Sequence, residues 1–165
     1  MQHYNNWSFD ASNNSKSTET VVEKHRELFV ASNKGKFGIV DPYFGWVVQP
    51  EYTEIQTSFR GSYWGMKADV WQLFNLRGET ISDKQFVCVS KYSSDFALVS
   101  LDGQNFGFVD KAGRFVIPPI YNFGRYLGNN MFAVKLNEKY GVVDIYGRTI
   151  LPFRFRSLDQ IPLLK

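Results

Sequence analysis

Short apolar runs, most of them with glycine at the second position, recur along the chain at nearly equal intervals. The clear runs span 37–40, 106–109 and 140–143, and a weaker run spans 71–74. They are short, aromatic and β-branched and are bounded by turn residues, which is typical of β-strands. Apolar side chains point to both sides of each run, so we expect these strands to be covered on both faces.

The spacing of the runs indicates an internal repeat. Their second positions are Gly38, Gln72, Gly107 and Gly141, at intervals of 34, 35 and 34 residues. A period between about 20 and 50 residues is typical of propellers, solenoids and other repeat arrays. The sequence therefore predicts an all-β protein built from four repeats of about 34–35 residues.

Each repeat continues from this strand into a hairpin. Asp110–Gly113 and Asp144–Gly147 fit a tight turn, in which Asp accepts hydrogen bonds from the turn backbone and Gly takes a positive φ. The strand that follows has an aliphatic residue that should face the core, and these residues are Val48, Ile81, Val116 and Ile150. A proline stands five residues after Gly45, Gly113 and Gly147, and we expect it to end that strand because it cannot donate to a ladder.

A third strand completes each predicted unit. Candidate runs at 66–70, 96–99 and 131–136 precede the next copy, and Leu28–Ser32 stands at the same distance before the first copy. We expect antiparallel three-stranded units in a compact, propeller-like or barrel-like array. The N-terminal strand could fill the place of the third strand that the last copy lacks, as in a closed ring, and the closed and the open array both stay open at this point.

The two ends of the chain differ in composition. Residues 1–20 are rich in Asn, Ser and Thr and poor in aliphatic side chains, so they are predicted to be a mobile N-terminal segment. Residues 21–165 are predicted to form one β domain of ordinary size.

The repeated motif resembles the WG repeat of bacterial proteins. In that family an aromatic-Gly-aliphatic-aliphatic-Asp strand, a glycine turn and a Val-Ile-Pro-x-Tyr segment recur, and the likeness covers about residues 34–155. The chain departs from the family where Trp is replaced by Phe37, Phe106 and Tyr140, and its one Trp-Gly pair, Trp64-Gly65, lies outside the register. The resemblance implies a binding or scaffold module and carries no shared catalytic residues.

Composition and charge limit the kinds of partner and cofactor that the sequence predicts. The net charge is +3, from 19 basic and 16 acidic residues without a strongly basic tract, so nucleic acid is not an expected partner. Neither an apolar run of about 18 residues nor an export signal is visible, and we expect a cytoplasmic protein that does not contact a membrane. One Cys and two distant His residues lack the spacing of a metal site, and nucleotide-binding motifs are missing. We therefore expect neither a metal nor another cofactor.

Three carboxylates at equivalent positions come closest to a catalytic set. Symmetry could gather Asp41, Asp110 and Asp144 around one axis, where they could bind a cation or serve a glycosidase. Asn75 breaks the set, and the predicted turn explains the aspartates without a ligand. We interpret them as turn residues and expect that the chain is not an enzyme.

Candidate partner contacts lie in the connections where the repeats stop resembling one another. Two of these connections, 57–64 and 122–130, combine Arg, Gly and Tyr, a composition common at interface hot spots. The residues expected to contact a protein partner are Arg60, Tyr63, Trp64, Arg125 and Tyr126. Alternatively, Tyr63 and Trp64 belong to the start of a core strand.

Two functional classes stay open at this point. The favoured one is a non-enzymatic protein-binding module, most concretely a bacterial immunity protein that binds and neutralises a cognate toxin, which is an analogy based on size and the missing catalytic motifs. The alternative is a carbohydrate-binding protein or carbohydrate-active enzyme that uses the repeated carboxylates.

Overall fold

A computed structural model describes residues 4–5, 27–57 and 61–162, which form four antiparallel sheets. The first sheet contains β1 (Tyr4–Asn5), β2 (Phe29–Asn33), β3 (Lys36–Val40) and β4 (Trp46–Tyr52). The second contains β5 (Glu54–Thr57), β6 (Ser62–Lys67) and β7 (Val70–Asn75). The third contains β8 (Cys88–Val89), β9 (Ala97–Ser100), β10 (Phe106–Val109) and β11 (Phe115–Tyr121). The fourth contains β12 (Phe123–Gly128), β13 (Met131–Leu136), β14 (Lys139–Asp144) and β15 (Thr149–Phe155), and a short 3₁₀ helix, Leu158–Gln160, follows it.

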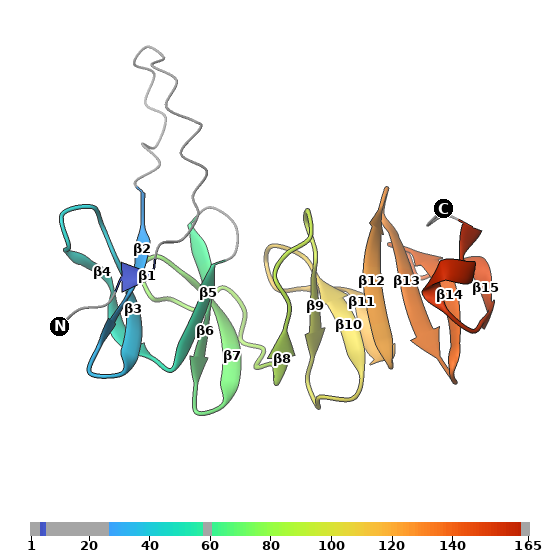
Figure 1. Cartoon of the computed structure of the whole chain (residues 1–165), viewed down its shortest axis with the longest axis horizontal. Coiled ribbons are helices and arrows are strands. Elements are labelled where there is room, and N and C mark those ends of the chain that lie inside the picture. Colours follow the sequence, from blue (N-terminus) through green and yellow to red (C-terminus); the bar gives the residue numbers. More distant parts are fainter. Residues whose placement is uncertain (1–3, 6–26, 58–60, 163–165) are drawn as a thin grey trace, which may run out of the picture.

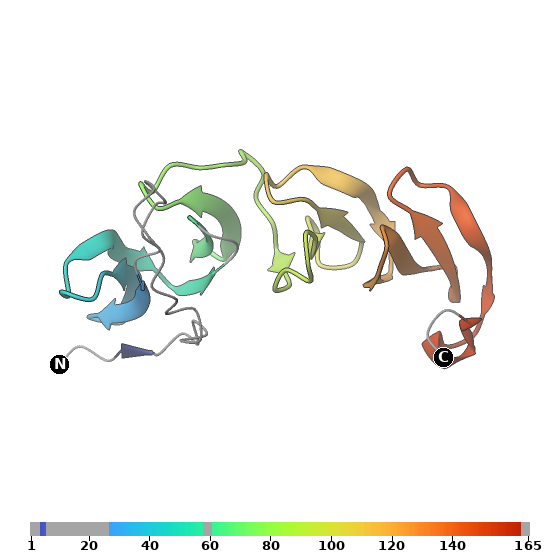
Figure 2. The same ribbon diagram turned by 90° about the horizontal axis from the view of Figure 1, so that it is seen from above.

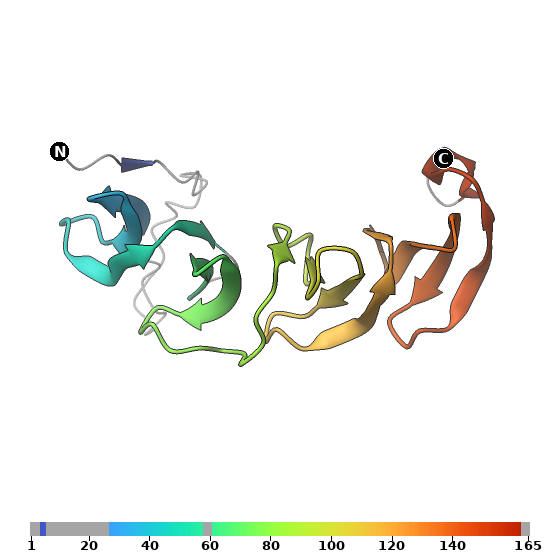
Figure 3. The same ribbon diagram turned by 90° about the horizontal axis from the view of Figure 1, so that it is seen from below.

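The four sheets stand in an open, curved row (Figure 1). The first sheet lies at one end of the row and the fourth at the other, so the predicted array of repeats is confirmed. Of the two possibilities left by the sequence, the array is open, and the N-terminal strand does not close a ring. Seen from above and from below, β8 and β12 lie on the inner side of the curve and β11 on its outer side (Figures 2 and 3). Leu28–Ser32 was correctly predicted as a strand, but β2 lies between β1 and β3 in the first sheet and does not complete the last sheet.

Each complete sheet has four strands where three were predicted. The additional strand comes first in its sheet and is represented by β5, β8 and β12, which fold back directly after the preceding outer strand. The run predicted at 66–70 is misplaced, because β6 ends at Lys67 and a turn with positive φ at Ala68 and Asp69 follows. The segment 1–20, predicted to be mobile, lies outside the described residues except for β1.

A bulge in the outer strand explains the glycine of the motif. Phe37 pairs with Tyr52 and Ile39 with Val48, so β4 has two more residues than β3 between these pairs. The additional residues form a bulge whose backbone passes over Gly38. A Cβ atom at Gly38 would collide with the carbonyl oxygen of Val48. The same collision would occur at Gly107, and at Gly141 a Cβ atom would lie 3.0 Å from the Leu151 oxygen, which is a tight approach. Glycine is therefore needed wherever the outer strand bulges over the third strand.

The second repeat has lost this glycine and has an irregular outer segment. Residues 79–86 pair with β7 only through the bridges Phe74–Thr80 and Trp71–Phe86. Gln72 occupies the glycine position and is half-buried. The number of residues between the two bridges equals that between the corresponding pairs of the first repeat, so the segment keeps its length and loses its regular ladder.

The predicted core column is shifted by one residue in three of the four repeats. Strand pairing places Val48, Ile117 and Leu151 opposite the residue after the glycine, and Ile117 is fully buried. Ile81 and Ile150 are 38% and 46% exposed, and Val116 is half-buried. The shift arises because the prediction aligned Gly45 of the first repeat with Gly113 and Gly147. The residue with positive φ in the first turn is Phe44, at +63°, so the alignment was off by one residue.

The prolines stand inside the outer strands and do not end them. Pro50 lies within β4 and Pro152 within β15, while Pro118 and Pro119 both lie within β11. A bulge in an edge strand leaves backbone positions without a ladder partner, and there the missing N–H of proline costs nothing.

The turn prediction is confirmed in all four repeats. Oδ1 of Asp110 accepts hydrogen bonds from the backbone N–H groups of Ala112 and Arg114, at 2.9 and 3.0 Å. Asp41 and Asp144 make equivalent pairs of bonds, and Asn75 does so through its amide oxygen. Each of these side chains therefore caps the turn that leads into the outer strand.

Apolar side chains fill the spaces between successive sheets. Ile39 on β3 faces the second sheet, and Phe74 on β7 faces back towards the first, so each sheet contributes one face to each neighbour. The outer face of the fourth sheet is covered by the C-terminal turn, where Ile161 is fully buried with Ala133 and Val142. No helix in the described part of the chain is long and apolar enough to cross a membrane.

Replacing Gly107 by Ala is expected to destabilise the protein by at least about 2 kcal/mol, since the bulge over it would have to move. Gln72→Ala is the matched control, because a Cβ already stands at that position of the second repeat, and it should cost less than about 1 kcal/mol. Urea unfolding measures both. Equal midpoints for the two variants would show that the close approach does not govern stability.

Ile117→Asp is expected to abolish cooperative folding, because burying an unpaired carboxylate costs several kcal/mol against a total stability of about 5 to 15 kcal/mol. Val116→Asp, at the half-buried neighbouring position, should still fold. Thermal unfolding followed by circular dichroism distinguishes them. The opposite ranking would restore the core column predicted from the sequence.

Asp144 should contribute stability that is lost in acid. Burial acts to raise the pKa of Asp144, but hydrogen bonds from the backbone and side chain of Arg148 and from the Tyr146 amide outweigh it, so the pKa lies below its usual value. A carboxyl group with a lowered folded-state pKa stabilises the fold above its unfolded pKa of about 4, and this contribution disappears as the pH falls towards the folded-state value. The parent should therefore exceed Asp144→Asn in stability at pH 7.

The difference between parent and Asp144→Asn should shrink below about pH 4. Asp83→Asn serves as the control, since the Asp83 side chain is 97% exposed and should give little difference from the parent at any pH. Urea midpoints measured from pH 7 to pH 2.5 provide the comparison. A difference that stays constant over that range would contradict the role assigned to Asp144.

Candidate interaction surface

Two of the predicted partner contacts are core residues. Tyr63 and Trp64 lie in β6 and are both 0% exposed, so their prediction as interface residues is wrong and the alternative of a core strand is correct. The Tyr63 ring stacks on Phe74 with 5.4 Å between ring centroids, and Trp64 meets Phe86 edge to face at 5.6 Å. β6 begins at Ser62, so Tyr63 and Trp64 are consecutive residues of one strand and point to opposite faces of the second sheet. Tyr63 packs in the space before this sheet and Trp64 in the space after it.

The other predicted contacts have different environments. Arg60 lies outside the described residues. Tyr126 is half-buried, and its ring packs against Phe96 and Phe132 with centroid separations of 5.1 Å in both cases. Arg125 is exposed on β12, and its contact with a partner stays a prediction.

Exposed apolar side chains gather on the outer strands and on the turns that lead into them. Among the described residues, six of the eight large apolar side chains that are exposed belong to these segments, and they are Tyr43, Phe44, Ile81, Ile120, Tyr146 and Ile150. Tyr43 and Tyr146 are 92% and 80% exposed, far more than packing in a sheet requires. These side chains recur along one side of the row, from the first repeat to the last, and extended surfaces of repeat arrays commonly contact macromolecular partners. We call these six residues, with the outer strands that carry them, the outer surface.

The outer strands are edge strands that are protected against strand addition. β4, β11 and β15 each end the strand order of a sheet. An open edge offers backbone N–H and C=O groups to any other strand, and proline removes the N–H groups. Prolines interrupt all three strands, so these edges are poorly suited to extension of the sheet by another strand.

Tyr43 and Tyr146 occupy the same place in two turns, two residues after the capping aspartate. Arg77 and Ala112 hold that place in the second and third repeats. The Arg148 guanidinium lies 5.2 Å from the centroid of the Tyr146 ring, which gives the last turn a paired Tyr and Arg surface. Sequence reasoning missed these tyrosines, although aligning the repeats on the capping aspartate would have placed them together.

A groove of 260 Å³ opens between the first two sheets. Residues Val47–Gln49 and Glu51–Tyr52 of β4 line one side, and Lys67, Phe74 and the turn residues Arg77–Gly78 line the other. Lys67 Nζ is 2.6 Å from a Glu51 oxygen and 4.5 Å from the centroid of the Tyr52 ring. The groove therefore combines a buried aromatic floor with a charged rim.

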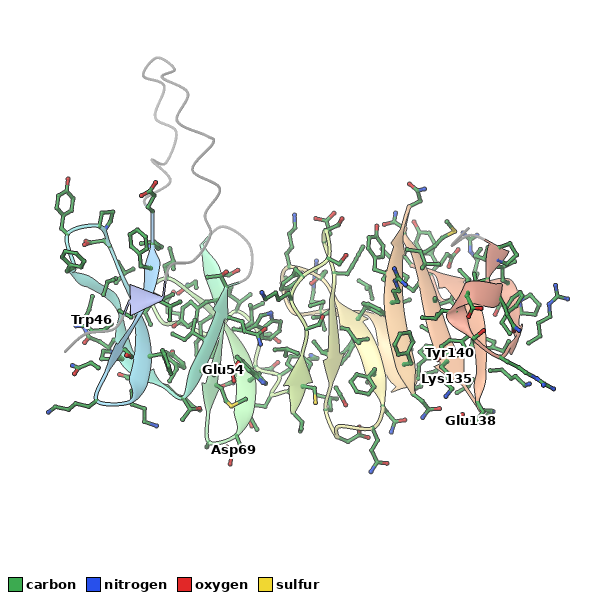
Figure 4. The ribbon with its side chains drawn as sticks, viewed as in Figure 1. Trp46, Glu54, Asp69, Lys135, Glu138 and Tyr140 are labelled. Carbon is green, nitrogen blue, oxygen red and sulfur yellow. The ribbon has the colours of Figure 1, made fainter. Side chains whose placement is uncertain are left out.

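The hairpin turns on the lower edge of the row carry charged residues, one of which forms an ion pair within the chain. Asp69 and Glu138 both lie along this edge (Figure 4). Lys135 Nζ is 2.8 Å from a Glu138 oxygen and 5.6 Å from the centroid of the Tyr140 ring. The charge of Glu138 is therefore partly offset by Lys135.

The repeated aspartates are engaged in their turns, and two of them form ion pairs as well. Asp110 pairs with Arg114 at 2.9 Å and Asp144 with Arg148 at 2.6 Å. Within the described ranges, no group of three or more His, Cys, Asp or Glu side chains could hold a metal ion.

Comparison with solved structures finds likeness at low sequence identity. Hsv2 of Kluyveromyces lactis matches over 76% of this chain and 46% of its own, with 12% identity and a TM-score of 0.44. BamB from Moraxella catarrhalis matches over 79% and 50%, with 12% identity and a TM-score of 0.44. A protein of unknown function from Bacteroides caccae matches over 87% and 67%, with 11% identity and a TM-score of 0.34. The chain thus spans about half the length of the first two.

No curated protein matches the sequence. The family model described as "WG containing repeat" matches residues 106–140, which run from the start of β10 to the second residue of β14. This segment includes the glycine strand, the capped turn and the bulged outer strand of the third repeat. The resemblance seen in the sequence is confirmed over residues 106–140, where the chain is similar to the WG containing repeat family.

Proposed function

We propose that this chain is a non-enzymatic protein-binding module and that it holds its partner on the outer surface. The observation that carries the proposal is the recurrence of exposed Tyr, Phe and Ile side chains on the outer strands and their turns. Tyrosines on tight turns lose little conformational entropy when a partner immobilises them, which makes them effective contact residues. Curved repeat arrays present extended surfaces of this kind to macromolecular partners.

The most concrete form of the proposal is a bacterial immunity protein that binds and neutralises a cognate toxin in the cytoplasm. An immunity protein needs a rigid surface that covers a toxin and needs no chemistry of its own. In support of that role, the sheets pack face to face, and prolines interrupt their outer edge strands.

Carbohydrate chemistry at the repeated aspartates has less support. A general acid or nucleophile needs a carboxylate whose oxygens are available to substrate. One oxygen of each aspartate accepts two backbone hydrogen bonds, and the second oxygen of Asp110 and of Asp144 faces an arginine. These groups act as turn caps, and the protein-binding proposal does not involve them.

The double variant Tyr43→Ala/Tyr146→Ala is expected to lose partner binding by at least about 2 kcal/mol, with unchanged folding, because both side chains are exposed. Val87→Ala/Leu101→Ala is the matched control, since it removes two exposed apolar side chains that lie off the outer surface. The partner is captured from the source cell on the parent protein and then titrated against both variants by calorimetry. Equal affinity of the two double variants would place the interface elsewhere.

The immunity role is tested in living cells. Expression of the captured partner alone should arrest growth of a bacterial host, and coexpression of the parent chain should restore it. Tyr43→Ala/Tyr146→Ala should fail to restore growth, whereas Val87→Ala/Leu101→Ala should succeed. A partner that is harmless when expressed alone would refute the immunity role and leave the binding role intact.

A further inference from the structure

The groove between the first two sheets differs chemically from its counterparts elsewhere in the row. Its rim carries Glu51, Lys67 and Arg77. Strand pairing and turn position identify the equivalent residues between the third and fourth sheets as Ile120, Leu136 and Tyr146. Between the second and third sheets they are Gln85, Leu101 and Ala112.

The floor of the groove, in contrast, is set by packing. Tyr52 has Tyr121 as its equivalent and Phe74 has Val143, and all four are buried. The fold therefore requires an apolar floor and accepts uncharged side chains at the rim. The charges of the first groove are not explained by the needs of the sheet packing.

The charges of the three rim residues Glu51, Lys67 and Arg77 do not sum to zero. Glu51 and Lys67 form an ion pair, and their side chains are 59% and 45% exposed. In the part of the chain that the structure describes, no ion pair or hydrogen bond involves the guanidinium of Arg77, which is exposed at the rim. The three groups together carry one net positive charge.

A hydroxyl proton in the floor adds a second feature that suits an anion. The Tyr52 and Tyr63 hydroxyls are 2.9 Å apart, and one hydrogen bond between them uses only one of their two protons. Burial, followed by the hydrogen bond with Tyr52, raises the pKa of Tyr63 well above its ordinary value, so Tyr63 keeps its proton at neutral pH. When Tyr63 donates to Tyr52, the proton of Tyr52 is available, and Tyr52 lines the groove.

From this combination we infer that the groove between the first two sheets binds a carboxylate, supplied by an acidic side chain of the partner protein. The Arg77 guanidinium presents parallel N–H donors that match the two oxygens of a carboxylate. Tyr52 supplies a further donor at the floor, and the volume of 260 Å³ admits one side chain. The inference rests on the proposed function, because it names the chemistry by which a protein partner would be recognised.

The test uses the full chain and two short peptides, acetyl-Gly-Glu-Gly-amide and acetyl-Gly-Gln-Gly-amide. Titration is followed by the backbone amide resonances of Glu51 and Gly78 in ¹⁵N-labelled protein. The Glu peptide should shift both resonances saturably, and the Gln peptide should not. Arg77→Met should weaken binding of the Glu peptide at least fivefold, whereas Arg154→Met, which removes an exposed arginine of β15, should leave it unchanged.

Three results would overturn the inference. These are equal shifts with the Gln peptide, undiminished binding by Arg77→Met, and binding of inorganic phosphate without binding of the Glu peptide. Because the peptides replace the natural partner, this test is separate from that of the proposed function. If Tyr43→Ala/Tyr146→Ala loses the partner while Arg77→Met binds the Glu peptide as the parent does, only the groove assignment fails.

Discussion

The contact between a glycine and the bulge that passes over it is the constraint on which each repeat depends. At Gly38 and Gly107 the outer strand comes so close that no side chain fits between the two backbones. The bulge bends the outer strand and restores its pairing with the start of the third strand, at Tyr52 and Tyr121. Those aromatic rings then enter the space before the next sheet. Regular stacking of sheets thus follows from a local steric requirement.

The same bulge shapes the surface that a partner would meet. Because the outer strand is an edge with an irregular ladder, proline is tolerated there, and its side chains alternate between the core and solvent. In β11 the fully buried Ile117 and the 52% exposed Ile120 belong to one strand that serves both purposes. An exposed apolar residue at such a position costs little stability, so these positions are free to vary with the partner.

Much of the repeat could be predicted from its strongest local signals. The glycine column and the capping aspartates stand in every sheet as expected, with Gln72 and Asn75 as the deviations of the second repeat. The direction of side chains in the outer strands could not be predicted, because a bulge changes the face to which each following residue points. In the first repeat the turn residue with positive φ is Phe44, so counting from Gly45 aligned Pro50 with prolines that stand one position earlier in their repeats. The amino-acid composition of the connections did not identify interface residues either. An aromatic residue such as Trp64 can pack in the core as well as against a partner, and Trp64 is buried in the core.

Internal repetition helps to separate residues that the fold needs from residues that it merely tolerates. Where all repeats agree, as in the capped turns, a structural cause is sufficient and function need not be invoked. Where one repeat departs and the departure weakens packing, as at Gln72, the sheet shows the cost in a broken ladder. Arg77 departs from its equivalents without any such loss, on a groove whose floor stays apolar and buried. Under the inference drawn above, the consequence of this charge lies outside the chain, in the anion that it attracts.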